Sequence, residues 1–402
     1  MRVLVFNCGS STLKFELMDV SSTDATAVAR LANGLVDKVG GQDASLRLQV
    51  GEGQPANRGV SAGNYREAAV LALDGLREAG LADIDAVGHR VVHGGDRFVM
   101  PTRIDDDVLT ALDGLSELAP LHNPPALEGI RAAREVLGPS VPMVAVFDTA
   151  FHSTLPEVAY TYALPHDLAA KYGIRRYGFH GIAHEYMLMR YSDMTNGPIS
   201  QSTIVTLQLG NGCSACAIRG GRSMDTSMGF TPLEGLVMGT RSGDLDPGIV
   251  GWLAEHETTS AETVVDWLNK RSGLLGLSGT TSDMRTLLSK RQSDPAADLA
   301  IEVFAYRVRK YIGAYMAALG DVGGAQALVF GGGIGEHAPY VRERILAGME
   351  WCGLKLDPNR NNASAANALI SADDSPRAIY VVAVDEELLI ARRTWQVIEH
   401  TS

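Results

Sequence analysis

A turn near the N-terminus gathers groups that bind phosphate. Residues Asn7–Lys14 read NCGSSTLK and place an amide, hydroxyls, a glycine and a lysine directly after a buried apolar run. Backbone N–H groups and the hydroxyls of Ser11 and Thr12 can surround phosphate oxygens, and Lys14 adds a positive charge. A plain polar hairpin explains the same residues equally well. The segment alone therefore leaves two interpretations open.

A glycine-rich segment occurs late in the chain. Residues 327–336 read ALVFGGGIGE, a buried strand that enters a glycine-rich turn. Without side chains in the way, a flat adenosine can lie against such a backbone. A dinucleotide-binding fingerprint is the competing interpretation. However, Glu336 stands where its third glycine belongs, and the segment does not open a first βαβ unit.

Two arginines are placed to bind anions. Arg90 lies near the end of an expected strand at residues 86–92, and Arg241 lies in a flexible loop at 238–244. The planar guanidinium suits a carboxylate or a transferring phosphoryl group. A surface salt bridge is the ordinary alternative for each.

An aspartate and a histidine add titratable groups. Asp148 follows the apolar run 143–147, at the carboxyl end of an expected strand, which is the edge where open α/β sheets bind ligands. His180 follows an arginine-rich stretch in a turn. On its own, a single histidine is more typical of a structural role than of catalysis.

Strands that alternate with helices must position these residues. Apolar runs and period-2 alternation predict strands, and apolar stripes at helical spacing predict helices, so the fold class is α/β. The strands are expected at 1–7, 13–18, 86–92, 143–147, 203–209 and 325–330, and helices at 65–79 and 298–318.

A strand, a Gly/Asn turn and a second strand occur twice. The first such hairpin surrounds residue 10, and the second consists of 204–209, the turn Gly210-Asn211-Gly212 and 213–218. Small residues in both turns expose backbone N–H groups to an anion. The simplest interpretation is a duplicated domain with a phosphate between the halves. The polar, glycine-rich stretch 41–63 is expected to be a surface loop.

Composition limits the partners. The chain has 402 residues, long enough for two domains, and a net charge of −12, which argues against nucleic acid or an anionic membrane as a partner. No apolar run is long enough to span a bilayer, and the N-terminus lacks the pattern of a signal peptide. The sequence therefore predicts a cytoplasmic protein.

The four cysteines are too few and too scattered for a disulfide framework. Cys213 and Cys216 form a C-x-x-C, which suggests redox or zinc chemistry. In a strand, however, residues three apart face opposite sides, and no second ligand pair follows. A metal site there is therefore the weaker interpretation.

Together and in this order, these segments resemble the acetate kinases, members of the acetate and sugar kinase, Hsp70 and actin superfamily. The resemblance runs nearly end to end, and its most specific blocks are 88–95, 120–125, 147–152, 176–181, 229–236 and 238–247. It implies two RNase H-like, actin-like ATPase domains from a duplicated βββαβαβα core, with the active site in the interdomain cleft. The domains are expected at 1–150 plus 385–402 and at 151–384, the second one for nucleotide binding and dimerisation.

The resemblance also implies site residues for ATP or ADP and for Mg²⁺ or Mn²⁺. Asn7 and Glu386 correspond to the metal environment. The nucleotide-binding positions are Ser11, Thr12, Lys14, Gln208, Leu209, Gly210, Asn211, Gly212, Asp283, Met284, Arg285, Gly333, Ile334, Gly335, Glu336 and His337.

For the acid and the transferred group, the resemblance implies catalytic roles for Arg90, Asp148, His180 and Arg241. Arg90 would bind the carboxylate, and His180 with Arg241 would neutralise the phosphoryl group in transit. Asp148 would orient the acid, through Arg241, because acetate is already ionised at neutral pH and needs no general base. The substrate pocket would be lined by Arg90, Val92, Leu121, His122, Phe179 and Pro232.

The activity implied is reversible phosphoryl transfer from ATP to acetate, in a homodimer. A kinase for propionate or another short fatty acid is the nearest alternative. An ATPase of the actin or Hsp70 kind would leave both arginines without a purpose. The chain departs from the usual family pattern at Cys8, Ile182, Ala183, Gln208, His337, Val384 and Asp385, and Gln208 keeps a hydrogen-bond donor but cannot carry charge.

Overall fold

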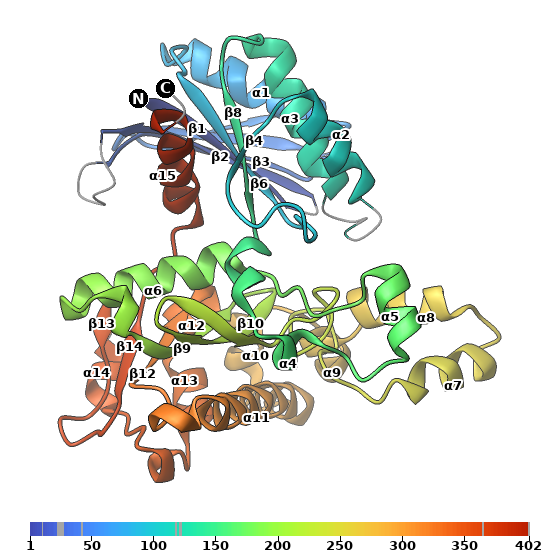
Figure 1. The fold of residues 1–402 in the computed structure, drawn as a ribbon, viewed down its shortest axis with the longest axis vertical. Helices are drawn as coiled ribbons and strands as arrows, with labels where there is room; N and C mark the ends of the chain where they lie inside the picture. Colours follow the sequence, from blue (N-terminus) through green and yellow to red (C-terminus); the bar gives the residue numbers. More distant parts are fainter. Residues whose placement is uncertain are drawn as a thin grey trace. The chain divides into compact units, whose positions relative to one another are not determined.

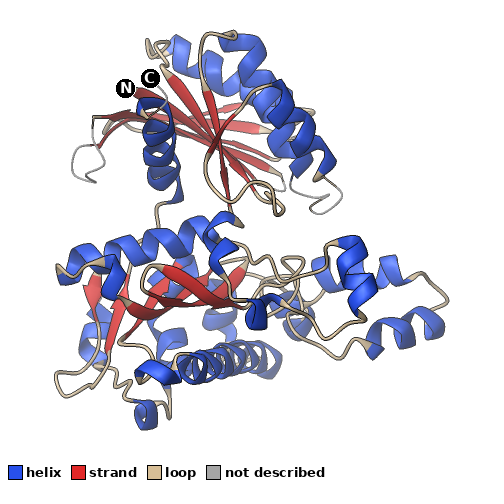
Figure 2. Ribbon diagram, in the orientation of Figure 1, coloured by secondary structure: helices blue, strands red, loops and turns tan. Residues whose placement is uncertain are grey.

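The chain folds into two compact units. The computed structural model describes residues 1–9, 11–21, 28–41, 43–116, 119, 123–363 and 366–400. The first unit consists of Met1–Phe151 and Asp385–Ser402, and the second of His152–Val384 (Figure 1). Each unit is built on one mixed β-sheet covered by helices (Figure 2). No helix in the described part of the chain is long and apolar enough to cross a membrane.

The first unit holds a sheet of order β5-β4-β3-β2-β1-β6-β8-β7. Helices α1, α2 and α3 belong to this unit, and α15 joins it from the far end of the chain. The bounds are β1 Arg2–Cys8, β2 Thr12–Val20, β3 Val28–Asp37, β4 Ser45–Val50, β5 Ala56–Gly59, α1 Tyr65–Glu78, β6 Ala86–Val91, β7 Thr102–Arg103, α2 Asp106–Gly114, α3 Asn123–Leu137, β8 Met143–Phe147 and α15 Glu386–Glu399.

The second unit holds a sheet of order β11-β10-β9-β12-β14-β13. Helix α6 covers one face of it and the long helix α11 the other (Figure 1). The bounds are α4 Glu157–Tyr160, α5 His166–Tyr172, α6 Gly181–Thr195, β9 Thr203–Leu209, β10 Cys213–Arg219, β11 Arg222–Thr226, α7 Gly248–His256, α8 Ala261–Lys270, α9 Gly273–Ser278, α10 Met284–Lys290, α11 Pro295–Ala318, β12 Ala327–Gly331, α12 Gly332–His337, α13 Pro339–Leu346, α14 Pro358–Ala363, β13 Ala368–Leu369 and β14 Ala378–Val381.

The two sheets repeat one topology. In the first, β1, β2 and β3 are antiparallel neighbours, and β6 and β8 follow parallel to β1. In the second, β9, β10 and β11 are antiparallel, and β12 and β14 follow parallel to β9. The α/β class and the duplicated core expected from the sequence are therefore confirmed.

Two stretches differ from the sequence-based expectation. Residues 41–63 are not a loop, because they contain β4 and β5, which extend the first sheet. Leu46 is buried and Arg47 is exposed, which is the alternation of a strand with one buried face, but the flanking glycines obscured this pattern. The prediction of a glycine-rich turn after β12 is also wrong, since Gly332–His337 form the helix α12. Gly332 has φ +74°, and a Cβ there would meet the backbone of Leu209 at 2.7 Å, so glycine is required.

Strand alternation decides which side chains face α15. In β1 and β2, Leu4, Phe6, Leu13 and Phe15 pack into the core shared with α1 and α3. The intervening residues therefore point to the other face of the sheet. On that face Gly88 of β6 lets α15 approach closely, since a Cβ would lie 2.4 Å from Oγ1 of Thr394.

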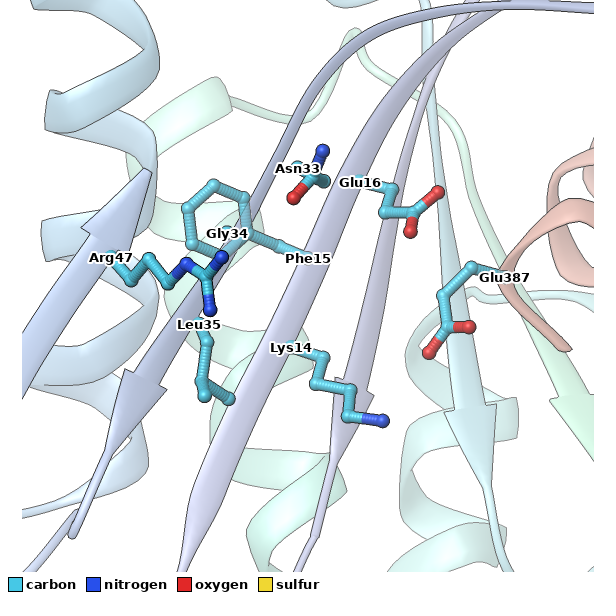
Figure 3. A pocket seen from close by; sticks show the side chains of 8 residues that line it. All are labelled: Lys14, Phe15, Glu16, Asn33, Gly34, Leu35, Arg47 and Glu387. Atoms are coloured by element: carbon cyan, nitrogen blue, oxygen red, sulfur yellow. The ribbon is translucent and has the colours of Figure 1, made fainter. Parts of the chain in front are cut away.

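The start of α15 is attached to this face by charged groups. Arg30 of β3 forms an ion pair with Asp385 and lies 3.7 Å from Oε2 of Glu16 on β2. Figure 3 shows Glu16 and Lys14 pointing into the same pocket as Glu387 of α15. Burial, opposed by Arg30 and reinforced by Glu387, raises the pKa of Glu16 to about 7. Oε2 of Glu16 also has no hydrogen-bond donor among the described residues.

Replacing Glu16 with glutamine should stabilise the protein at high pH. Because burial raises the pKa of Glu16 from its usual value of 4.5 to about 7, ionisation of this carboxyl destabilises the folded protein as pH rises through that window. Glu16→Gln removes this destabilisation, worth about 1–3 kcal/mol, at pH 8 but has little effect at pH 5. Scanning calorimetry should show a melting temperature several degrees higher than wild type at pH 8 only. The exposed Glu52→Gln is the control, and an equal shift at both pH values would contradict this account.

Candidate functional site

The first unit carries an arginine–aspartate pair in which the aspartate is buried and the arginine partly buried. Arg90 lies on β6 and Asp148 directly follows β8, its parallel neighbour, so both side chains reach the carboxyl edge of the sheet. Nε of Arg90 donates to Oδ1 of Asp148 at 2.9 Å, and Nη2 donates to Oδ2 at 2.5 Å. Asp148 is only 1% exposed. This bidentate pair fixes the guanidinium in one orientation.

Asn7 and the start of α15 complete the surroundings of Arg90. Nη1 of Arg90 donates to Oδ1 of Asn7 at 3.0 Å, and Nδ2 of Asn7 donates to Oε1 of Glu387 at 2.9 Å. Oε2 of Glu386 lies 4.0 Å from Nε of Arg90. Within the first unit the observed partner of Asp148 is thus Arg90, so this carboxylate can orient the guanidinium of Arg90.

The charges around Arg90 are unevenly balanced. Burial lowers the pKa of Arg90, but the charges of Asp148 and Glu386 outweigh that effect and raise it, so the guanidinium stays charged. Burial raises the pKa of Glu386 to about 7. The positive charge of Arg90 opposes this rise, and the negative charge of Asp148 adds to it. One arginine therefore faces several carboxylates, an arrangement that favours a further cation.

The oxygen donors of this cluster fit a hard cation. Asn7 offers an amide oxygen, and Glu386 and Glu387 offer carboxylates, which are the ligand types that Mg²⁺ prefers. Among the described residues, no group of three acidic, histidine or cysteine side chains is arranged to hold a metal by itself. That agrees with Mg²⁺, which is usually held by one or two carboxylates together with substrate phosphates.

The N-terminal turn lies beside this cluster. Lys14 sits opposite Asn7 in the β1–β2 register and lines a pocket of about 300 Å³ with Glu387 (Figure 3). The N–H of Gly9 donates to the carbonyl of Thr12 at 2.8 Å, which closes the turn, and Ser11 is exposed.

In the second unit the predicted catalytic groups meet at a glycine. The Gly210–Gly212 turn joins β9 to β10. A Cβ on Gly212 would lie 3.2 Å from Nε2 of His180 and 3.8 Å from Nη1 of Arg241. His180, Arg241 and the turn therefore form one cluster, with the missing side chain leaving room between them.

Contacts with neighbouring segments position both side chains. His180 precedes α6 with φ 57°, an uncommon conformation for a residue with a side chain, and its Nδ1 lies 3.0 Å from Oγ of Ser214. Arg241 donates from Nη1 to the carbonyl of Pro232 at 3.2 Å. Both side chains are thus held by groups outside their own segments.

A pocket of about 420 Å³ adjoins the Gly210–Gly212 turn. Many of the predicted nucleotide residues line it, and Ser282, Leu288 and Ala338 are lining residues that the sequence did not indicate. The predicted lining residues are Gly210, Asn211, Asp283, Met284, Arg285, Gly333, Ile334 and His337. Arg285 is held beside the mouth by its own neighbour Asp283, with Nη2 2.8 Å from Oδ2. A flat, largely apolar group fits such a space.

Other predicted nucleotide residues lie outside this lining. Oε1 of Gln208 is buried without a hydrogen-bond partner among the described residues, and Leu209 is fully buried. The carbonyl of Gly335 accepts from Arg342, and Oε1 of Glu336 accepts from the N–H of Val384 at 3.1 Å. These residues are sequence neighbours of the lining residues but do not line the pocket themselves.

The predicted acyl-pocket residues divide between the two units. Val92 is buried in the first unit, and Phe179 is buried in the second. Pro232 is adjacent to Arg241 through its carbonyl. Leu121 and His122 lie outside the described residues.

The C-x-x-C pair does not form a metal or redox site. Cys213 and Cys216 are both free and buried in β10. Burial raises the pKa of Cys213 to about 12, and it also raises that of Cys216, so both stay thiols. Sγ of Cys216 contacts Oγ of Ser223 at 3.3 Å instead.

The sequence did not indicate the polar side chains behind His180. His184 contacts Ser214 and Thr206, and His152 contacts Ser223 and the carbonyl of Phe179. The available signal was the spacing of His180 and His184. They are four residues apart, His180 directly before α6 and His184 in its first turn, and side chains at this spacing lie on the same side of a helix. Their partners come from β9, β10 and β11, which no local pattern reveals.

Known proteins resemble the chain over its whole length. The model of the Acetokinase family matches residues 2–392. The acetate kinase of Solibacter usitatus is 48% identical, covering 98% of this chain and 97% of the relative. That of Thermoanaerobacterium thermosaccharolyticum is 47% identical, covering 99% of both.

Solved structures agree with this result. The crystal structure of Porphyromonas gingivalis acetate kinase has a TM-score of 0.90 and 38% identity, covering 99% of both chains. A propionate kinase from Francisella tularensis has the same TM-score and identity, covering 98% of this chain and 99% of that one. With a family match over nearly every residue and relatives of this identity, the chain belongs to the acetokinase family.

Proposed function

We propose that this chain transfers the γ-phosphate of ATP to acetate, reversibly, giving acetyl phosphate and ADP. The observation that carries the proposal is the partly buried Arg90, oriented by Asp148 at the carboxyl edge of the first sheet in a member of the acetokinase family. A guanidinium fixed in this way binds a small carboxylate in one orientation. The proposed location is the cytoplasm, where both nucleotides are present.

The proposed reaction is a direct in-line displacement. Acetate is ionised at neutral pH, so its oxygen attacks the γ-phosphorus without a general base. A bond forms between that oxygen and phosphorus while the bond to the β,γ-bridging oxygen breaks and leaves ADP. Catalysis then consists of positioning and charge stabilisation. Arg90 would hold the acid, and Asp148 would keep Arg90 in place.

The second unit would supply the nucleotide site. The adenosine would occupy the pocket beside Gly210 and Asn211, lined by Met284 and Ile334. The backbone of the Gly210–Gly212 turn would bind phosphate oxygens, as would Lys14 with the Ser11–Thr12 turn in the first unit. His180 and Arg241, which meet at Gly212, would donate to the oxygens of the transferring phosphoryl group.

Asn7 and Glu386 would hold Mg²⁺. When bound, Mg²⁺ neutralises charge on the nucleotide phosphates. The chain itself prepares this site in two ways: Asn7 is oriented by Arg90 and Glu387, and the carboxylates near Arg90 leave a surplus of negative charge. On this assignment the first unit serves the acid and the metal, and the second unit serves the nucleotide.

Acetate-dependent turnover tests the function. ATP consumption should require added acetate and yield an acyl phosphate that hydroxylamine traps as a hydroxamate. We expect kcat/KM for propionate to be about ten- to 200-fold lower than for acetate, because the branched Val92 narrows the acyl pocket by about one methylene. Val92→Ala should reduce this ratio. A preference for propionate would favour the short-chain fatty acid alternative, and acetate-independent turnover would favour an ATPase.

Removing the charge of Asp148 should weaken acid binding. Asp148→Asn keeps the shape but releases Arg90, so we expect KM for acetate to rise and kcat/KM to fall about ten- to 100-fold, the size of a charged hydrogen bond. KM for ATP should change little. Glu302→Gln is a matched control, because Glu302 forms a similar fork with Arg344 at 2.6 and 2.7 Å on α11 and α13. Near-wild-type kinetics of Asp148→Asn would remove any essential role for its charge.

We also propose a homodimer formed through the second unit. Apolar side chains are exposed on α7 and α8, among them Ile249 at 41%, Trp252 at 58% and Val265 at 40%. A tryptophan that stays 58% exposed although its ring stacks on His256, beside further exposed apolar groups, suits contact with a second copy. Sedimentation should give twice the mass of one chain for wild type and a shift to monomer for Trp252→Glu. A monomeric wild type would contradict the proposal.

A further inference from the structure

A chain of hydrogen bonds runs from the second sheet to His180. Oγ1 of Thr206, on β9, lies 2.7 Å from Nδ1 of His184 on α6. Nε2 of His184 lies 2.7 Å from Oγ of Ser214, on β10, and the same Oγ lies 3.0 Å from Nδ1 of His180. Thr206, His184 and Ser214 are completely buried. Solvent therefore cannot substitute for any of these contacts.

Only two proton arrangements satisfy this chain. Burial, followed by the nearby His152 and His180, lowers the pKa of His184 well below 6.5, so its ring is neutral with one N–H. If His184 donates from Nε2, then Ser214 donates to Nδ1 of His180, and the neutral His180 carries its proton on Nε2. If His184 donates from Nδ1, every bond reverses, and His180 carries its proton on Nδ1.

Thr206 decides between the two arrangements. Among the described residues, its hydroxyl contacts no acceptor other than Nδ1 of His184. In the reversed arrangement that nitrogen is protonated, so the hydroxyl hydrogen of Thr206 would be buried without an acceptor. A buried unsatisfied donor carries its full desolvation penalty. The direction from Thr206 to His184 to Ser214 to His180 leaves no donor unsatisfied.

We propose that Thr206, His184 and Ser214 are positioning residues that hold His180 as the neutral Nε2–H tautomer, so that it donates from Nε2 to the transferring phosphoryl group. The inference rests on the proposed function of His180. Nε2 is the ring nitrogen at the Gly210–Gly212 turn, 3.2 Å from the Cβ position of Gly212. The proton is thereby presented where the phosphate is expected.

The surroundings of His180 suit a neutral donor. The charged and titratable groups around it are Arg241, which shares the Gly212 position, His184 behind Ser214, and His152, whose ring centroid lies 5.6 Å from that of His184. Arg241 already supplies a positive charge at Gly212, and a second one on the imidazole would be repelled. A neutral N–H avoids this repulsion and still stabilises developing negative charge.

A second set of contacts fixes the backbone just before His180. Nε2 of His152 lies 3.0 Å from the carbonyl oxygen of Phe179, and only a protonated nitrogen can bond to it. Nδ1 of His152 then accepts from Ser223 at 2.8 Å. This contact helps to hold His180 at φ 57°, so the backbone and the ring are fixed by separate partners.

The kinetic experiment uses Ser214→Ala. In the variant, Nδ1 of His180 no longer accepts a hydrogen bond from Ser214, so this contact no longer selects a tautomer. We expect kcat to fall about five- to tenfold, as for one lost hydrogen bond in the transition state, with little change in KM for acetate. The deficit should shrink as falling pH protonates the imidazole, because the protonated ring has an N–H at Nε2 in any case. Thr206→Val, equal in size, should give the same pH pattern with a smaller loss.

Ser227→Ala is the matched control. Ser227 is fully buried, and its Oγ accepts a hydrogen bond from the N–H of Ala215 on β10 at 2.9 Å. Removing this hydroxyl therefore weakens the same strand but leaves the hydrogen bonds from Thr206 to His180 intact. Its activity relative to wild type should not vary with pH. If Ser214→Ala and Thr206→Val follow the wild-type pH profile in parallel, the chain does not set the tautomer and the proposal is wrong.

Nitrogen-15 NMR of histidine side chains gives a readout that does not need turnover. With His180 assigned by comparison with His180→Gln, wild type at pH 8 should show a protonated Nε2 and an unprotonated Nδ1, and Ser214→Ala a mixture. A wild-type His180 protonated on Nδ1, or on both nitrogens, would overturn the proposal. If the tautomer is as expected but no acyl phosphate forms, the proposed function fails while the hydrogen-bond chain stands.

Discussion

The largely buried ion pair of Arg90 and Asp148 imposes a constraint on the rest of the first unit. Removing two charges from water is expensive, and one bidentate contact compensates for that cost only if further polar groups complete the surroundings. Asn7 and Glu386 do so: Asn7 depends on the register of β1, and Glu386 depends on where α15 begins. A shift of β1 by one residue would turn Asn7 into the apolar core and bring Phe6 to the charged face. The charge balance of the site therefore requires the observed register of the sheet.

The chain path explains how these groups assemble. After β8 the chain forms the short helices α4 and α5 and then α6. Helix α6 packs on β9 and β12 of the second sheet. The helix that follows β14 is α15, which packs on β1, β6 and β8 of the first sheet. Each sheet is thus covered by the helix that succeeds the other. In both cases the N-terminal end of that helix carries site residues, His180 before α6 and Glu386 at the start of α15.

The sequence was sufficient to predict an element where the pattern of apolar and polar residues within that element determines its structure. Strands β8 and β9 have the bounds that their apolar runs predict, since each is buried and followed by a polar or glycine residue. It was insufficient where tertiary packing overrides propensity. Three glycines make α12 a poor helix by propensity, yet the close approach of Gly332 to Leu209 fixes the backbone there. Segment β4 was missed because glycines flank its short alternation.

The candidate site shows the same division between local and long-range information. The residue types at Arg90 and the Gly210–Gly212 turn indicate anion binding. Asp148 indicates a ligand-binding edge because it directly follows a strand. The partner of Asp148 did not follow from the sequence, because it depends on the parallel pairing of β6 with β8. The partners of His184 depend on the antiparallel pairing of β9 with β10, which places Thr206 opposite Cys216 and Ser214 opposite Gln208.

Buried polar residues in β9 and β10 also argue against a purely structural account of these strands. Valine and alanine would fill the positions of Thr206 and Ser214 without any need for hydrogen bonds. A hydroxyl in a fully buried strand is tolerated only when it is paired, and here both hydroxyls pair with a histidine that is itself buried. Such a network constrains the core more than apolar packing does, because each member needs a donor or acceptor in one direction. The network ends at a side chain beside the Gly210–Gly212 turn, so the direction of its bonds has a chemical consequence at that turn.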